Sequence, residues 1–158
     1  MNIFVLDKTP KLAAIYHTDK HVIKMILESA QMMSTAVRKS GIDKGYKIAY
    51  ENHPCTIWVR ESLDNWMWLG SLSYYLNIEY KFRFNKIINH KSYDVIESLP
   101  HPNIKSIGLT PFAQAMPDIY KNKDSVEAYR KYYIKEKSHL FVWTNRQVPY
   151  WISQNGYK

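Results

Sequence analysis

The stretch KHVIKMILESAQMMSTAVRK, residues 20–39, carries the strongest structural signal in the chain. Its apolar residues recur every three or four positions, which places them on one face of an α-helix. Thr18 or Asp19 can cap the beginning of this helix, and Gly41 lies just past its end. The pattern therefore predicts an amphipathic helix, and with it a helical fold class.

The opposite side of this helix carries a polar stripe. At 100° per residue the stripe contains His21, Lys24, Glu28, Gln31, Thr35 and Arg38. In one interpretation it is a solvated face with a Lys24–Glu28 pair. In the other it is a wall of a polar site, where Glu28 performs acid–base or charge-stabilising work and His21 and Lys24 contact phosphate. Spacing alone leaves both interpretations open.

The remaining elements follow from proline, glycine and capping residues. Pro54 suits the first turn of a helical segment that extends toward Asn85, either as one helix kinked near Gly70 or as two helices that meet there. Thr110 with the proline after it predicts a short helix, and a tyrosine-rich helix begins at 124 or 125 and continues to about 138. Residues 3–6 are an edge strand or a buried extended segment. We expect a mainly α, single-domain helical bundle over residues 1–158, with at most a short N-terminal strand.

Composition and charge narrow the function classes. The 158 residues include 22 Lys and Arg against 14 Asp and Glu, a net charge of +8, and a single cysteine, Cys55. One cysteine excludes an internal disulfide and a cysteine-based zinc cluster, and no apolar run approaches the ~20 residues of a membrane span. These features predict a cytoplasmic protein without a membrane contact whose partner is a polyanion: DNA or a small phosphate-bearing nucleotide.

Several side chains outside the polar stripe could bind such a ligand. Asn52 and His53 precede a helix start, where free amides favour an anion, and Arg60 could reach the same anion. Candidates for phosphate or base contact thus are Gln31 of the polar stripe together with Asn52, His53, Arg60, Arg83, Lys86 and Gln114. Candidates for stacking on a base are Trp58, Trp68 and Tyr129. The alternative for each is structural: a cap, a surface ion pair or a core ring. We expect no metal site and no cofactor, because the six histidines are scattered apart from His17 and His21.

Five blocks of the chain resemble a family of small bacteriophage proteins. They are residues 2–7, 19–25, 52–55, 58–62 and 108–118. The resemblance implies a phage origin, and therefore the cytoplasm of an infected bacterial host.

A weaker resemblance is to the pyrimidine-dimer DNA glycosylase and abasic-site lyase family, which is also small, basic and helical. It implies that Glu28 is the catalytic carboxylate on an early helix, and the pair His53–Pro54 is similar to a His–Pro pair of that family. In that family the attacking group is the N-terminal amine exposed when the initiator methionine is removed before a small residue. Asn2 normally leaves Met1 in place, so Lys24 is the alternative amine.

Three hypotheses follow. The first is a DNA base-excision enzyme similar to the pyrimidine-dimer glycosylases, a hydrolase or lyase. The second is a phage counter-defence protein that sequesters or cleaves a small or cyclic nucleotide signal, with the ligand at an interface of a homo-oligomer. The third is a non-catalytic phage protein that binds a partner.

Overall fold

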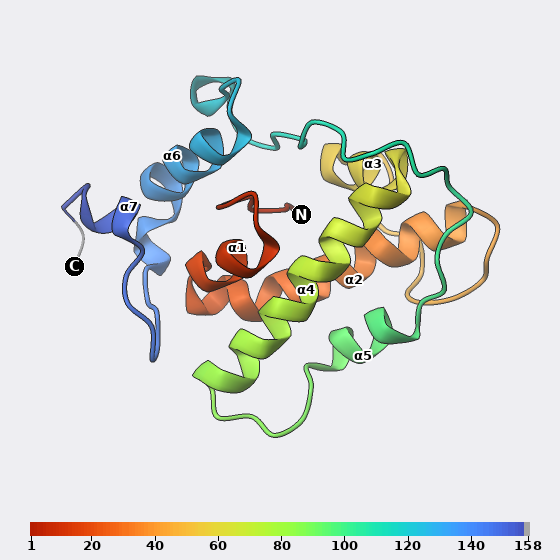
Figure 1. Cartoon of the computed structure of the whole chain (residues 1–158), viewed down its shortest axis with the longest axis horizontal. Coiled ribbons are helices and arrows are strands. Elements are labelled where there is room, and N and C mark those ends of the chain that lie inside the picture. The colour runs from red at the N-terminus through yellow and green to blue at the C-terminus, as the bar shows by residue number, and fades with distance from the viewer. Residues whose placement is uncertain (157–158) are drawn as a thin grey trace.

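The computed structural model describes residues 1–156, and within them the chain forms helices and no strand (Figure 1). The elements are α1 (Pro10–Tyr16), α2 (Asp19–Lys39), α3 (Pro54–Glu61), α4 (Leu63–Arg83), α5 (Lys91–Ser98), the 3-10 helix η1 (Asp118–Tyr120), α6 (Ser125–Lys137), the 3-10 helix η2 (Ser138–Leu140) and α7 (Tyr150–Ser153). The predicted helical bundle is confirmed. Residues 157–158 of the domain expected over 1–158 lie outside the described part. No helix within residues 1–156 has the length and apolar character needed to cross a membrane.

The two long helices α2 and α4 form the centre of the bundle. α4 packs on both α1 and α2, while α3 and α5 pack against α2 (Figure 1). The apolar face predicted for α2 is the one that is buried: Val22, Ile26 and Met33 are at most 1% exposed. Each such side chain contributes about 1.5–3 kcal/mol by leaving water, so this face fixes α2 within the bundle.

The N-terminal segment runs through the interior of the bundle without regular secondary structure. Residues 3–6 form no strand and are between 0% and 4% exposed. Of the two expectations for this run, the edge strand is wrong, and the burial expected in the alternative is confirmed. The first residue of the chain therefore lies among the helices, near the middle of the view in Figure 1.

Two predictions for helices are wrong, each for its own reason. The helical segment from Pro54 breaks at Ser62 and not at Gly70, because the backbone of Ser62 is extended and its hydroxyl accepts a hydrogen bond from Asp64 N, which caps α4. The helix expected from Thr110 does not form. Thr110 N instead donates to Asn65 Oδ1 at 3.0 Å, and Asn65 Nδ2 donates to Thr110 Oγ1 at 2.7 Å. A buried amide of α4 thus binds this segment by long-range hydrogen bonds.

The tyrosine-rich helix α6 begins where the sequence predicts. Asp124 is its cap, and its carboxylate accepts from the backbone N–H groups of Val126 and Glu127. The helices α1 and α5 are not foreseen by the sequence patterns above. Both are short, with seven and eight residues, and lie beside longer helices that cover them.

Candidate active site

Glu28 is inside the molecule and faces the α-amine of Met1. Its Oε1 lies 2.8 Å from the amine nitrogen, and the side chains of Glu28 and Met1 are 8% and 3% exposed. Met1 as a whole residue is partly exposed, so the exposure lies in its main-chain atoms, to which the amine belongs. Glu28 Oε2 is buried and has no hydrogen-bond partner among residues 1–156. The pair therefore places the α-amine beside a carboxylate that has one oxygen without a hydrogen-bond partner in the described part of the chain.

The side chain of Asn2 fixes the position of this amine. Asn2 Nδ2 donates to the carbonyl of Ala115 at 2.9 Å, and Asn2 Oδ1 accepts from Ile3 N at 2.8 Å. The hydroxyl of Tyr129, in α6, also donates toward Asn2 Oδ1 at 3.1 Å. The segment from 108 to 118 thus supplies a backbone carbonyl to the N-terminus.

His53 lies within electrostatic reach of the amine and the carboxylate. Burial lowers the pKa of His53, the ammonium of Met1 lowers this pKa further, and Glu28 opposes both effects. Its Nδ1 accepts a hydrogen bond from Cys55 N at 3.1 Å, which caps α3. In the neutral imidazole the proton therefore resides on Nε2, which makes His53 a donor next to the amine–carboxylate pair.

The other members of the polar stripe lie on either side of Glu28. Lys24 is exposed one turn before it, and Gln31 is half-buried about one turn after it. His21 is buried and stacks on Phe4 with ring centroids 4.5 Å apart. Its Nδ1 is 2.7 Å from the Tyr133 hydroxyl, and burial lowers the pKa of His21 to about 3. The stripe is therefore a mixture of both interpretations, with an exposed lysine and a buried acid one turn apart.

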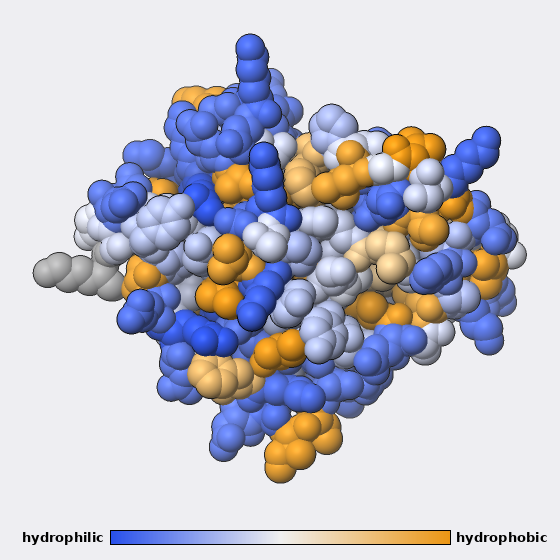
Figure 2. All heavy atoms as spheres, viewed as in Figure 1, coloured by the Kyte–Doolittle hydropathy of each residue, from blue (hydrophilic) through white to orange (hydrophobic). Residues whose placement is uncertain are grey.

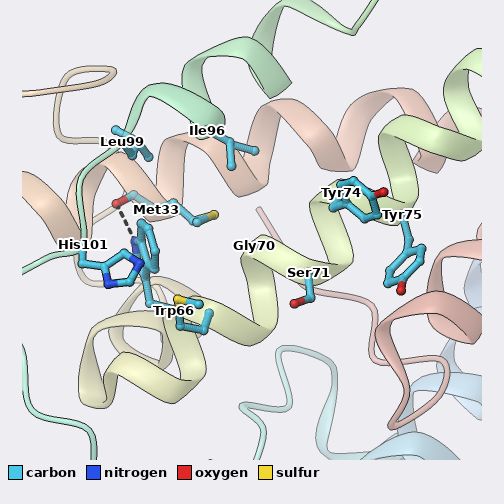
Figure 3. Close-up of a pocket in the computed structure, with 10 residues that line it drawn as sticks. Met33, Trp66, Gly70, Ser71, Tyr74, Tyr75, Ile96, Leu99 and His101 are labelled. Atoms are coloured by element: carbon cyan, nitrogen blue, oxygen red, sulfur yellow. Dashed lines mark hydrogen bonds between the residues drawn. The ribbon is translucent and has the colours of Figure 1, made fainter.

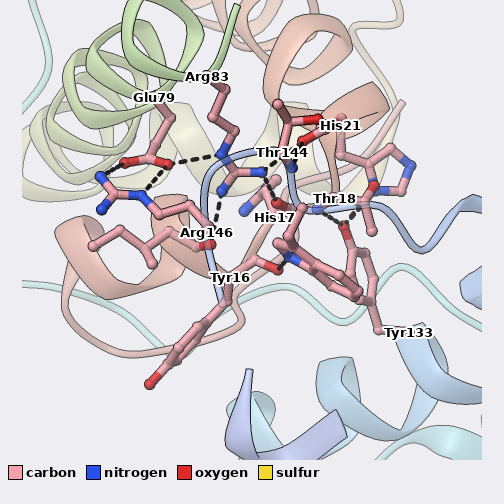
Figure 4. A network of polar contacts seen from close by, with 12 residues as sticks. Tyr16, His17, Thr18, His21, Glu79, Arg83, Tyr133, Thr144 and Arg146 are labelled. Carbon is pink, nitrogen blue, oxygen red and sulfur yellow. Dashed lines mark hydrogen bonds and ion pairs between the residues drawn. The ribbon is translucent and has the colours of Figure 1, made fainter. Parts of the chain in front are cut away.

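Arg83, a candidate for phosphate contact, lies in the interior of the molecule and is 2% exposed. Its guanidinium contacts Glu79 at 2.8 Å and donates to the carbonyls of His17 and Ile15 at 2.7 and 2.8 Å. Arg146 adds two further bonds to Glu79, at 2.7 and 3.1 Å (Figure 4). This network joins α4 to the turn before α2 and to the C-terminal segment, at a place without access for a phosphate.

The remaining polar candidates are dispersed. Arg60 donates to the backbone carbonyl of Glu51 at 2.7 Å, and Gln114 donates to the carbonyl of Asn122 at 2.6 Å. Asn52 and Lys86 are exposed in loops. None of these four contacts Glu28 or the amine of Met1 in a described hydrogen bond or ion pair.

The three rings proposed for base stacking are in the core. Trp58 and Trp68 are 2% and 9% exposed and meet edge to face, with centroids 6.2 Å apart. Tyr129 is 0% exposed. Their indole and phenol groups bond to backbone or to buried side chains, as buried Trp and Tyr rings do. His17, which could have paired with His21 on a metal, instead approaches the carbonyl of Ala13 at 2.6 Å through its Nδ1.

A separate hollow of about 340 Å³ opens between α2, α4 and α5 (Figure 3). Its walls are apolar and aromatic, with Met33, Trp66, Tyr74 and Leu99 among them. It contains neither Glu28 nor Met1. Around it the exposed face of α4 mixes apolar and polar side chains (Figure 2). The ion pair between the Met1 amine and Glu28 therefore lies outside this hollow.

Comparison with known proteins identifies the family of this chain. The family model described as pyrimidine dimer DNA glycosylase matches residues 1–81, half of the chain, a range that includes Met1, Glu28 and His53. The chain matches no curated protein and no solved structure. On the family match, this chain belongs to the pyrimidine dimer DNA glycosylase family.

Proposed function

We propose that this protein is a DNA base-excision enzyme in which the α-amine of Met1 attacks the sugar of a damaged nucleotide and Glu28 assists. The observation that carries the proposal is the 2.8 Å contact between the amine and a buried carboxylate. An amine at a chain end is a competent nucleophile toward a sugar carbon once it has lost its proton. A DNA glycosylase-like activity is also what the family match suggests.

The proposed reaction balances as follows. Glu28 takes a proton from the ammonium of Met1, and the free amine bonds to C1′ of the nucleotide. The bond between C1′ and the base nitrogen breaks, and the base leaves with the electron pair and is protonated by solvent. The secondary ammonium formed at C1′ then loses a proton to solvent. The nitrogen lone pair next forms a C=N bond, and the bond between C1′ and the ring oxygen breaks to give an iminium, while Glu28 returns its proton to the ring oxygen. Glu28, with one oxygen unpartnered, is placed to stabilise the positive charge that develops.

A group of cations beside the site supports DNA as the substrate. Lys24 of α2, Lys137 at the end of α6 and His139 of η2 all act electrostatically on the buried ring of His21, so the three lie in the same region of the molecule. None of the three forms an ion pair with a described residue. Lys137 also lies 5.4 Å from the ring of Tyr132. We propose that this group, here called the Lys24 cluster, holds backbone phosphates next to the flipped nucleotide.

The nucleotide-sequestering and partner-binding hypotheses have no contact in residues 1–156 that favours them over base excision. Lys24 remains the competing amine, because it lies one helical turn from Glu28.

The decisive experiment is borohydride trapping on duplex DNA that contains a cyclobutane pyrimidine dimer, and on a duplex with an abasic site. We expect a covalent adduct that peptide mass spectrometry maps to Met1. Glu28→Gln should abolish the adduct on the dimer substrate, and Glu127→Gln, which changes an exposed acid of α6, should leave it intact. No adduct on either duplex, or one mapped to Lys24, would refute the proposed chemistry.

A further inference from the structure

We infer that Tyr129 is a positioning residue of the active site, which acts through the side chain of Asn2 to hold the Met1 amine against Glu28. The inference rests on the proposed function and extends it to the half of the chain that the family model does not match, since Tyr129 belongs to α6 and the match ends at residue 81.

The Tyr129 hydroxyl is the centre of a buried hydrogen-bond group. It accepts from Ala115 N at 3.2 Å and donates toward the carbonyl of Ala113 at 2.7 Å or toward Asn2 Oδ1 at 3.1 Å. Asn2 returns a bond to the same segment through Nδ2 and the carbonyl of Ala115. Burial raises the pKa of Tyr129 well above its ordinary value, so the phenol keeps its proton and remains a donor.

Helix α3 contributes to the same group through Cys55. Its Sγ lies 3.5 Å from Asn2 Oδ1 and 4.0 Å from the Tyr129 hydroxyl. Burial raises the pKa of Cys55 to about 11, so it is a thiol and a donor. The Asn2 side chain is thereby fixed from two directions, by α3 and by α6.

This hydrogen-bond group can control the position of the amine because the amine belongs to Met1, the residue directly before Asn2. A chain terminus frays unless something ties it down. Here the tie is at residue 2, so the amine can move only by rotation about the bonds of Met1, whose side chain is itself packed. Glu28 is fixed independently by α2. Reacting atoms must meet at about 3–3.5 Å, and a misplacement of about 1 Å costs on the order of 100-fold in rate.

Tyr129→Phe is the test, because it removes one oxygen and keeps the buried ring. We expect the single-turnover rate of adduct formation to fall at least about 10-fold, with DNA affinity unchanged within about two-fold. The matched control is Tyr46→Phe, which removes a hydroxyl bonded to Ser92 Oγ at 3.0 Å, outside the Asn2 group. Its rate should equal that of the wild type at a temperature where both variants are folded.

A double-variant cycle separates positioning from general loosening. Asn2→Leu removes the other side of the contact and, as a bulky second residue, leaves Met1 in place, which intact mass confirms. If Tyr129 acts through Asn2, the double variant is no slower than the slower single variant. Multiplied effects would overturn the inference, as would a wild-type rate in Tyr129→Phe. In both cases a wild-type adduct on Met1 would still uphold the proposed function, whereas no adduct in the wild type would refute both.

Discussion

Replacing Arg83 distinguishes a buried structural cation from a phosphate-binding one. Arg83→Ala removes the side chain that joins Glu79 to the carbonyls of His17 and Ile15. The Arg83 side chain is fully buried, and its loss leaves the buried carbonyl of His17 and the partly buried carbonyl of Ile15 without this partner. Glu79 then keeps Arg146 alone, and Asp19 loses its ion pair with Arg83. Breaking one side of a buried ion pair costs about 3–5 kcal/mol. At about 2–4 °C per kcal/mol for a chain of this size, Tm should fall by roughly 10 °C.

The assay is thermal unfolding by circular dichroism together with the salt dependence of DNA affinity. Arg146→Ala provides the graded comparison: its side chain is 31% exposed and contacts the same carboxylate, so it should cost less than Arg83→Ala. Neither variant should change the slope of log affinity against log salt. If Arg83→Ala leaves Tm within about 2 °C of the wild type and lowers that slope by about one phosphate contact, Arg83 binds DNA and the reasoning is refuted.

Two further predictions follow from charges on and near α2. Burial lowers the pKa of His17 to about 4 and of His21 to about 3, so the unfolded chain binds more protons below about pH 6.5. The free energy of unfolding should thus fall as pH drops from about 6.5 toward 4, by about 1.4 kcal/mol per pH unit for each histidine. Urea titrations at several pH values would measure this decrease. A free energy of unfolding that does not change over this pH range would contradict the burial of both rings. Lys24→Ala and Lys137→Ala should each lower the salt slope of DNA binding by about one, while Lys44→Ala, beyond the far end of α2, should leave it unchanged. Equal salt slopes for all three lysine variants would contradict the binding of DNA at the Lys24 cluster.

The parts of the fold that were predictable are those encoded by nearby residues. The periodicity of α2 and the Asp124 cap of α6 are local signals, and the structure has both helices at the expected places. The break at Ser62 was also readable, because a serine whose hydroxyl can reach the backbone two residues on is a capping signal stronger than one glycine. The absence of a helix at Thr110 could not be predicted from the local sequence, because it depends on a hydrogen bond to Asn65, 45 residues earlier.

The candidate site shows the same division. Helical geometry places Glu28 in a polar stripe, but whether that stripe is exposed to solvent depends on which segment packs over it. The cover is the N-terminal segment, and the sequence hint is that an apolar run starting at Ile3 draws the first residue inside with it. The prediction for Arg83 is wrong because this residue is buried and not available to a phosphate. Its neighbours along the chain are basic, but Asp19 and the carbonyl of His17, more than 60 residues away, decide its position.

The unit that can perform the chemistry is larger than the segment that identifies the family. A segment without regular secondary structure has backbone groups that need partners from elsewhere. Helix α6 supplies one for the N-terminal segment, because Arg130 Nε donates to the carbonyl of Leu6 at 2.8 Å. The hydroxyl of Tyr133, also in α6, accepts from Thr18 N, in the turn before α2, at 3.0 Å. The C-terminal segment adds Trp143 Nε1, which donates to the carbonyl of Tyr16 at 3.0 Å. Residues 1–81 therefore contain the amine, the carboxylate and Cys55, but not the contacts from α6 and the C-terminal segment that also hold the N-terminal part of the chain in place.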